Sequence, residues 1–286
     1  MMSASEFEFL RALVRARSAI VIEAGKEYLV ESRMAPVLRD RNLATMADLV
    51  AALRAAPGSE LEWSVVEAMT TNETSWFRDV HPFEALKTVV LPDLIASRAS
   101  ERSLRIWSGA CSSGQEAYSV AIMLADHFPA LASWEVSILA TDISHAMVRR
   151  TGRGFYEQLE VNRGLAPADL ARHFEQVGSR WQVSAELRGR VHARQLNLAE
   201  PWPPLPRFDL ILLRNVLIYF DHEVKRAVLR RARQTLRPDG LLFLGSSESM
   251  LSLDDSWERI TCGRAVAYRA IAMGSARTAG AACECS

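Results

Sequence analysis

Residues 104–116 read LRIWSGACSSGQE, and this stretch decides the fold. Its first four residues form a short apolar run typical of a buried strand. Gly109 and Gly114 follow, just before an amphipathic run that begins at Glu116. A strand, a glycine loop and a helix in this order open a βαβ unit, in which the loop lets backbone approach a ligand at the sheet's carboxyl edge. The stretch therefore predicts an α/β fold with a ligand site at this loop.

The second half of the chain repeats this alternation of strands and helices. Strands are predicted at residues 104–107, 136–140, 208–213 and 241–244, and helices at residues 116–128 and 224–236. Such alternation indicates a mostly parallel sheet. Residues 152–195 interrupt the rhythm with five glycines and the alternating run WQVS at residues 181–184. They predict an inserted β-rich subdomain.

The two ends of the chain differ from the middle. Residues 1–72 show only helical spacing, as at Phe7, Leu10 and Val14, and predict a small helical domain. Pro36 is expected to end or kink a helix there. Residues 73–272 form the predicted α/β domain, and the small, polar residues 273–286 predict a disordered tail.

The composition excludes several classes of protein. Hydrophobic residues make up 49% of the 286 residues, and 34 basic side chains balance 34 acidic ones. A neutral chain of this hydrophobicity is not disordered as a whole, and the missing basic excess argues against a nucleic-acid-binding protein. No apolar run is long enough to cross a membrane and the start is not typical of a signal peptide, so a cytoplasmic protein is expected. The four cysteines form no CxxC pair and predict no metal site.

The glycine loop carries the first candidate site residue. A P-loop would need lysine and serine or threonine where Gln115 and Glu116 stand, and Glu116 would repel a phosphate. An acidic side chain here suits a cationic ligand, such as the ammonium group of a methionine-derived sulfonium cofactor. The alternative is a favourable charge in the first turn of a helix, worth about 0.3–1 kcal/mol.

Polar groups also follow two other predicted strands. Asp142 comes after the strand at residues 136–140, where its carboxylate would accept hydrogen bonds from ribose hydroxyls or, alternatively, cap the next helix. The run RNVLIYFD at residues 214–221 places guanidinium, amide and phenol groups at the ligand crevice, with a mere turn as the alternative. LRPDG at residues 236–240 predicts a turn with an architectural role.

Four motifs in their order along the chain resemble the class I S-adenosylmethionine-dependent methyltransferases, and more narrowly the CheR-type chemotaxis receptor glutamate methyltransferases. The motifs are NxTxxFR at residues 72–78, the glycine loop at 109–119, ATDI at 140–143 and RNVLIYFD at 214–221. The resemblance extends to about residue 269. It implies a Rossmann-like methyltransferase sheet with an inserted small β-subdomain and a helical N-terminal domain, which matches the segments separated above.

The resemblance also implies roles for individual residues. Tyr219 would lie near the transferring methyl group, so Arg78 and Tyr219 are the catalytic candidates, with a structural ion pair as the alternative for Arg78. One departure is GQEA at residues 114–117, where many members have two acids and a proline. The implied contacts to S-adenosylmethionine are Asn72, Thr74, Arg78, Glu116, Asp142, Asn197, Leu198, Arg214 and Asn215.

The implied reaction transfers a methyl group to a receptor glutamate and gives a γ-methyl ester and S-adenosylhomocysteine. A glutamate with a pKa of about 4.3 is already ionised in the cell, so no general base is needed. Catalysis then depends on alignment and on exclusion of water. The alternatives are a methyltransferase for RNA or amino groups, although residues 215–218 lack the Pro-Pro-aromatic run of N-methyltransferases, and a non-enzymatic S-adenosylmethionine-binding regulator.

The helical domain and the β-subdomain predict the partners. Residues 11–41 carry seven basic and four acidic side chains, and the family docks the receptor's cytoplasmic, helical methylation region on this domain. Arg33, Arg39 and Arg41 are the predicted docking residues, with a solvated helix face as the alternative. The link before Trp181 has one glycine and is shorter than in members that bind a receptor pentapeptide, which predicts a pentapeptide-independent enzyme. An exposed strand edge would still be able to pair with another peptide. We expect a monomer, no nucleic-acid partner and no membrane insertion.

Overall fold

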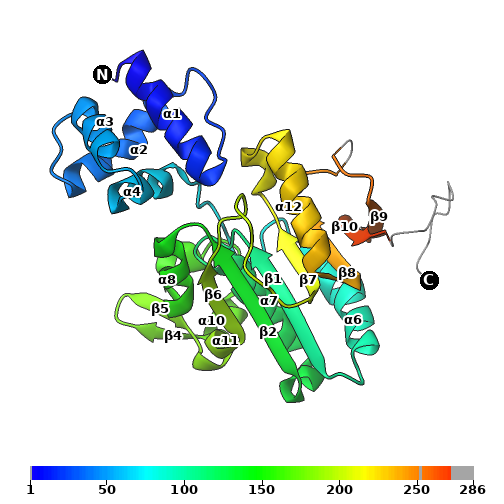
Figure 1. Ribbon diagram of the computed structural model, residues 1–286. Helices are drawn as coiled ribbons and strands as arrows, with labels where there is room; N and C mark the ends of the chain where they lie inside the picture. Colours follow the sequence, from blue (N-terminus) through cyan, green and yellow to red (C-terminus); the bar gives the residue numbers. More distant parts are fainter. Residues whose placement is uncertain (1, 251–252, 272–286) are drawn as a thin grey trace.

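The computed structural model describes residues 2–250 and 253–271. The predicted disordered tail at residues 273–286 therefore lies outside the described residues. Figure 1 shows a bundle of N-terminal helices, in blue, beside a larger α/β domain that contains the sheet. Among the described residues, no helix is long and apolar enough to cross a membrane.

The helical domain confirms the prediction from helical spacing. It consists of α1 (Ala4–Ser18), α2 (Glu27–Asp40), α3 (Met46–Ala55) and α4 (Glu60–Met69). Phe7, Leu10 and Val14 of α1 are buried in its core. Helix α2 does not end at Pro36 but continues to Asp40, because Met34 and Val37 on either side of the proline are buried and hold the helix by packing.

The main sheet has seven strands in the order β6-β2-β1-β7-β8-β10-β9. All pairs are parallel except those of β10, which runs antiparallel to both of its neighbours. The strand order reverses between β1 and β7, and this is the switch point where a doubly wound sheet opens a crevice for ligands. The sheet confirms the predicted Rossmann-like fold. Its strands are β1 (Ser103–Gly109), β2 (Glu135–Asp142), β6 (Val191–Gln195), β7 (Phe208–Leu213), β8 (Leu236–Leu244), β9 (Trp257–Cys262) and β10 (Ala265–Ala270).

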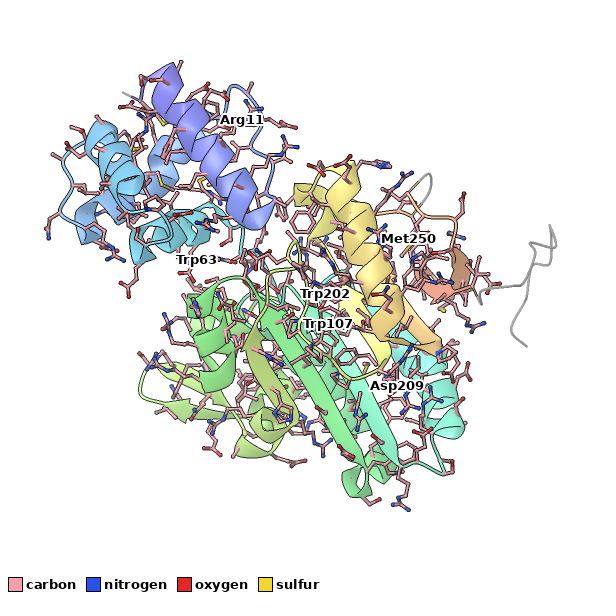
Figure 2. All side chains as sticks on the ribbon, viewed as in Figure 1. Arg11, Trp63, Trp107, Trp202, Asp209 and Met250 are labelled. Atoms are coloured by element: carbon pink, nitrogen blue, oxygen red, sulfur yellow. The ribbon has the colours of Figure 1, made fainter. Side chains whose placement is uncertain are left out.

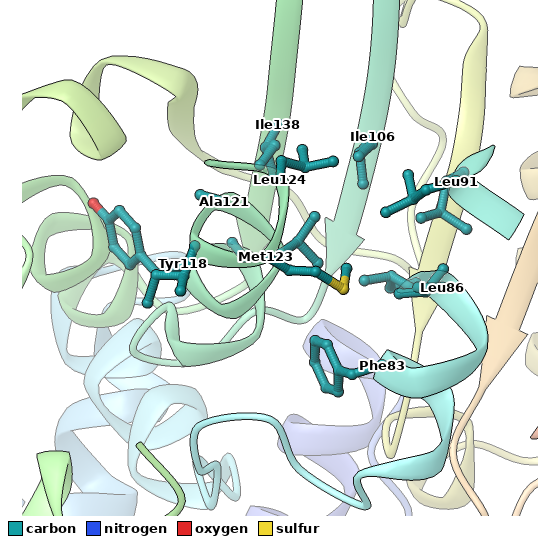
Figure 3. Close-up of a cluster of buried hydrophobic side chains, with 14 of the residues drawn as sticks. Phe83, Leu86, Leu91, Ile106, Tyr118, Ala121, Met123, Leu124 and Ile138 are labelled. Atoms are coloured by element: carbon teal, nitrogen blue, oxygen red, sulfur yellow. The ribbon is translucent and has the colours of Figure 1, made fainter. Parts of the chain in front are cut away.

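Apolar side chains cover both faces of this sheet. On one face, Tyr118 and Met123 of α7 (Gln115–His127) pack with Ile106 of β1 in a buried cluster (Figure 3). The same cluster includes residues of α5 (His81–Ala85), the π-helical turn η1 (Leu86–Val90) and α6 (Leu91–Ser97). On the other face, the rings of Trp107 and Trp202 meet edge to face at 4.8 Å (Figure 2), and α12 (His222–Thr235) packs there. Strand β7 is buried along its whole length, and its sequence is apolar except for Asp209.

The insertion forms a separate small sheet with the strand order β3-β5-β4. A two-residue turn at Gly178 joins β4 to β5, since Val177 pairs with Arg180. Strand β6 returns to the main sheet beside β2, so the small sheet ends at Val183, before the predicted limit at residue 195. The elements of this region are α8 (His145–Arg153), β3 (Phe155–Glu157), α9 (Gln158–Val161), α10 (Pro167–His173), β4 (Phe174–Val177), β5 (Arg180–Val183) and α11 (Ala185–Arg190).

The LRPDG segment at residues 236–240 is part of β8, which begins at Leu236 rather than at the predicted residue 241. The register between β7 and β8 shifts here, between Phe208 and Leu210. Arg98 lies 2.6 Å from Asp209 and 2.6 Å from Asp239, so the segment ties α6 to the sheet. This agrees with its predicted architectural role.

Candidate functional site

A pocket that is partly open to solvent lies at the carboxyl ends of β1, β2, β6 and β7. The structure brings all the predicted cofactor and catalytic residues together here, although they come from five separate segments of the chain. The pocket is lined by Asn72, Thr74, Arg78, Glu116, Asp142, Asn197, Leu198, Arg214, Asn215 and Tyr219.

The helical domain supplies part of the pocket wall, which the sequence did not predict. Ser18 and Ile20, from the end of α1 and the segment after it, line the pocket. The peptide N–H of Val21 donates to the carbonyl oxygen of Tyr219 at 2.9 Å. Asn197 Nδ2 donates to the carbonyl oxygen of Arg17 at 2.7 Å. The site is therefore closed on one side by the N-terminal domain.

The glycine loop has an unusual backbone. Ala110, Ser112 and Gly114 all have positive φ angles, of 56°, 51° and 95°. Gly114 must be a glycine, because a Cβ there would lie 2.8 Å from Cγ2 of Thr151. Ser112 Oγ donates to the carbonyl oxygen of Asn72 at 2.8 Å, which joins the loop to the first motif.

Asp142 is 5% exposed, and both its carboxylate oxygens accept backbone hydrogen bonds. Oδ2 accepts from the N–H of Ser112 at 2.8 Å and Oδ1 from the N–H of Ser144 at 2.9 Å. Helix α8 is capped by Ser144, whose Oγ accepts from Met147 N–H, so the alternative of Asp142 as the cap is wrong. Burial raises the pKa of Asp142. Since each carboxylate oxygen has two lone pairs, each can accept one more hydrogen bond from a ligand hydroxyl.

Arg214 is the centre of a buried charge network. Its side chain is 2% exposed, with Nη1 2.9 Å from Glu116 Oε2 and Nη2 2.7 Å from Asp79 Oδ2. Nη2 also donates to the carbonyl oxygen of Arg78 at 2.9 Å. Glu116 is therefore neither an unpaired acid nor a simple first-turn charge, because Arg214 and Ser108 Oγ both donate to it. Two carboxylates around one guanidinium give this network one net negative charge, which suits a ligand cation; Glu116 and Arg214 line the pocket.

The Nε atom of Arg214 donates no hydrogen bond within the described part of the chain. It is buried and has no partner among residues 2–250 and 253–271. A buried donor without a partner is costly, and a ligand acceptor would satisfy it. Asp79, the second carboxylate of the network, was missed by the sequence analysis. Its position directly after the NxTxxFR motif was the available signal.

Arg78 lies on a strained loop. Phe77, Asp79 and Val80 have positive φ angles of 46°, 69° and 51°, which is uncommon for residues other than glycine. Arg78 Nη1 donates to the carbonyl oxygen of Glu73 at 2.9 Å. Within the described part of the chain its guanidinium makes this hydrogen bond and no ion pair. Its charge remains available for an anionic ligand group.

The last wall of the pocket is the segment after β7. Asn215 has a positive φ of 58°, and a short 3-10 turn, η3 (Leu217–Tyr219), follows it. The N–H of Asn215 donates to Glu248 Oε2 at 2.7 Å. Glu248 was also missed, although a polar residue soon after a buried strand was the signal used for Asn215. On the β6 side, Leu198 is 5% exposed and gives the pocket an apolar surface.

The predicted docking residues do not line the pocket; they lie on α2 and directly after it, and Arg33 donates to Thr70 and Thr71, which do line it. Arg33 is engaged within the protein, because Nη1 donates to the carbonyl oxygens of Met69 at 2.8 Å and Thr70 at 2.7 Å. Arg41 lies 3.1 Å from Ser64 Oγ and is exposed, as is Arg39. Arg33 therefore holds the end of α4, which its predicted role did not include. Arg39 and Arg41 are both exposed, and Arg41 forms an exposed ion pair with Glu60 at 3.8 Å.

Comparison with known proteins identifies the family. Residues 72–266 match the family described as CheR methyltransferase, SAM binding domain, and residues 5–70 match CheR methyltransferase, all-alpha domain. Chemotaxis protein methyltransferase 1 of Pseudomonas aeruginosa is 43% identical over 271 residues, which cover 93% of this chain and 98% of the relative. Chemotaxis protein methyltransferase of Vibrio parahaemolyticus is 38% identical over 271 residues, or 93% and 97% of the two chains.

These matches confirm the resemblance inferred from the four sequence motifs. The boundary between the two family domains, at residues 70–72, lies where the first motif begins and where the chain enters the pocket. Together with the sheet order and the pocket at its switch point, they establish that this chain belongs to the CheR methyltransferase family.

Proposed function

We propose that this protein transfers a methyl group from S-adenosylmethionine to glutamate side chains in the cytoplasmic methylation region of chemoreceptors. The product is a glutamate γ-methyl ester, and the protein works as a cytoplasmic monomer. Family membership and the names of the relatives support methyl transfer in chemotaxis. The observation that carries the proposal is the pocket that gathers every predicted cofactor residue at the sheet's switch point.

The chemistry of the pocket fits S-adenosylmethionine. Asp142 has lone pairs left to accept the two ribose hydroxyls. The net negative network of Arg214, Asp79 and Glu116 suits the ammonium group, and Arg78 suits the carboxylate. When bound, the cofactor supplies a methyl group on a positively charged sulfur. Ile143 and Leu198 line the pocket and offer apolar surface to an aromatic base.

The protein's own part in the reaction is to position and dehydrate the acceptor. A glutamate carboxylate is ionised at neutral pH, so its oxygen needs no base. Arg78 and Tyr219 line the pocket and orient the acceptor carboxylate and the sulfonium toward each other, with Arg78 shared between the carboxylates of acceptor and cofactor. Ile20 and Val216 contribute apolar wall that helps to exclude water. Opposite charges are neutralised as the methyl moves, and a dry site favours such a step.

The test is a transfer assay with tritiated cofactor on receptor cytoplasmic fragments, followed by mild alkali. We expect label in the receptor that is released as volatile methanol, because carboxyl esters hydrolyse under these conditions and methylated amines do not. Alkali-stable label would contradict the glutamate acceptor. Binding of S-adenosylhomocysteine in calorimetry without any transfer would instead indicate a regulator.

We further propose that the receptor is found through the helical domain and without a tethering pentapeptide. The β4–β5 turn contains only Gly178 and Ser179, so little backbone is free there to wrap an added strand. Calorimetry with C-terminal receptor peptides, together with methylation of receptors that lack this terminus, tests the proposal. Micromolar peptide binding and a large loss of rate on truncation would contradict it.

A further inference from the structure

Glu248 lies outside the pocket but contacts one of its walls. Its carboxylate accepts three backbone hydrogen bonds: Oε2 from Asn215 N–H and from Gly245 N–H, both at 2.7 Å, and Oε1 from Ile218 N–H at 3.2 Å. Glu248 does not line the pocket, whereas Asn215 and Ile218 do. A single carboxylate therefore joins the end of β8 to the segment that follows β7.

The segment it holds is an irregular one. Asn215 has a left-handed φ of 58°, and the next residues make only the short turn η3. The N–H groups of such a turn have few backbone partners of their own. A carboxylate that accepts from the N–H groups of Asn215 and Ile218 holds the start and the middle of this segment, and hydrogen bonds to a charged acceptor are the stronger kind. The bend places Tyr219 and Phe220 at the pocket.

The position of Glu248 is itself fixed. Leu213 of β7 pairs with Leu244 of β8, so the residues after both strands leave the sheet side by side. The N–H of Glu248 donates to the carbonyl oxygen of Gly245 at 2.9 Å, which closes a tight turn. A Cβ on Gly245 would lie 2.6 Å from Asn215 Nδ2 and 2.7 Å from Glu248 Oε2. Only glycine lets the two segments approach this closely.

We infer that Glu248 is a positioning residue for the cofactor site: it holds the wall from Asn215 to Phe220 in the shape that binds S-adenosylmethionine. The inference rests on the cofactor site of the proposed function and not on the identity of the methyl acceptor. Glu248 touches no reacting group and acts only through the backbone that it holds.

The experiment compares wild type with Glu248→Gln, which keeps the shape of the side chain but turns one acceptor oxygen into a donor. The matched control is Glu258→Gln, an exposed glutamate on β9. Binding of S-adenosylhomocysteine is measured by calorimetry at 25 °C, and the melting temperature is measured without ligand. We expect the dissociation constant to rise about tenfold or more in Glu248→Gln, since charged hydrogen bonds are lost, and to stay unchanged in the control.

The remaining outcomes separate this inference from the proposed function. A Glu248→Gln protein that melts earlier but binds with wild-type affinity would overturn the positioning role. A wild-type protein that does not bind S-adenosylhomocysteine would overturn the proposed function and this inference with it. Hydrogen exchange of the wild type gives a readout that needs no variant: the amides of Asn215 and Ile218 should be protected, and exchange at the rate of free peptides would also refute the inference.

Discussion

Replacing Arg214 by methionine tests whether the buried charge network shapes the cofactor site. The change leaves Asp79 and Glu116, whose side chains are 31% and 14% exposed, without their shared cation. Removing one partner of a fully buried pair costs about 3–5 kcal/mol. Because both carboxylates retain some contact with water, we discount this to about 2–3 kcal/mol. In a domain of this size, the melting temperature should fall by roughly 5–10 °C.

The same change should weaken the cofactor site. Arg214 holds the carbonyl oxygen of Arg78, and the loop around it has three positive φ angles that need such support. We expect the dissociation constant of S-adenosylhomocysteine to rise about tenfold, which corresponds to roughly 1.4 kcal/mol. Arg214→Lys should lie between wild type and Arg214→Met, since a single ammonium cannot replace the planar fork of the guanidinium.

Scanning fluorimetry and calorimetry measure both quantities on the same samples. The control is Arg105→Met, which breaks an exposed pair, 3.7 Å from Glu135, with side chains that are 36% and 70% exposed. Such pairs contribute less than about 1 kcal/mol, so its melting temperature should stay within about 3 °C. An Arg214→Met protein as stable as this control would refute the reasoning. A lower melting temperature with unchanged affinity would show that the Arg78 loop keeps its shape unaided.

Three further predictions concern the ligands. Asp142→Ala should weaken S-adenosylhomocysteine binding about 10–100-fold while the fold survives, because hydrogen bonds to a charged group contribute about 1.5–3 kcal/mol; unchanged affinity in calorimetry would exclude Asp142 from the site. Burial raises the pKa of Asp142, so affinity should be full above that raised pKa and fall as the pH drops through it, at a higher pH than for an ordinary aspartate near about 3.9. Asp142→Asn should lose this acid-side decrease, and identical pH profiles for the two proteins would contradict the assignment. Alanine at Arg39 and Arg41 should raise the KM for receptor and flatten its salt dependence without changing cofactor affinity; a salt response equal to that of the exposed control Arg264→Ala would contradict receptor steering.

Local patterns predicted the sheet and its helices well. The mostly apolar sequence of β7 and the strand-loop-helix pattern of residues 104–116 identified their elements, because strands that are buried on both faces are rich in apolar residues. Pro36 does not end α2, one of the two outcomes expected for it, because the packing of Met34 and Val37 outweighs the local preference of proline. The end of the insertion was misplaced because β6 is a short edge strand, and its pairing with β2 is decided by tertiary contacts.

The sequence predicted many of the residues that line the pocket, but not the hydrogen bonds and ion pairs that connect the segments around it. Motif residues such as Asp142 and Arg214 were found because polar groups follow buried strands at the carboxyl edge. Asn197 came from the resemblance alone. Asp79 and Glu248 were missed, since their roles depend on which distant segments meet, and no spacing along the chain encodes that. The same holds for Ile20, which reaches the pocket from the other domain.

The end of α1 and the residues after it form part of the pocket wall. Cofactor binding and the contact between the two domains should therefore strengthen each other. Ser18 and Ile20 face the same space as Asp142 and Asn215. A ligand that touches two bodies binds best when they are assembled, and it therefore stabilises the assembled arrangement by the same factor. S-adenosylmethionine should thus stabilise the contact between the helical domain and the α/β domain. A receptor that shifts the helical domain should then change the rate at which S-adenosylhomocysteine dissociates. Receptor binding and cofactor release would then be coupled through the contact between the domains. The hydrogen bonds of Arg17 with Asn197 and of Val21 with Tyr219 are part of this contact.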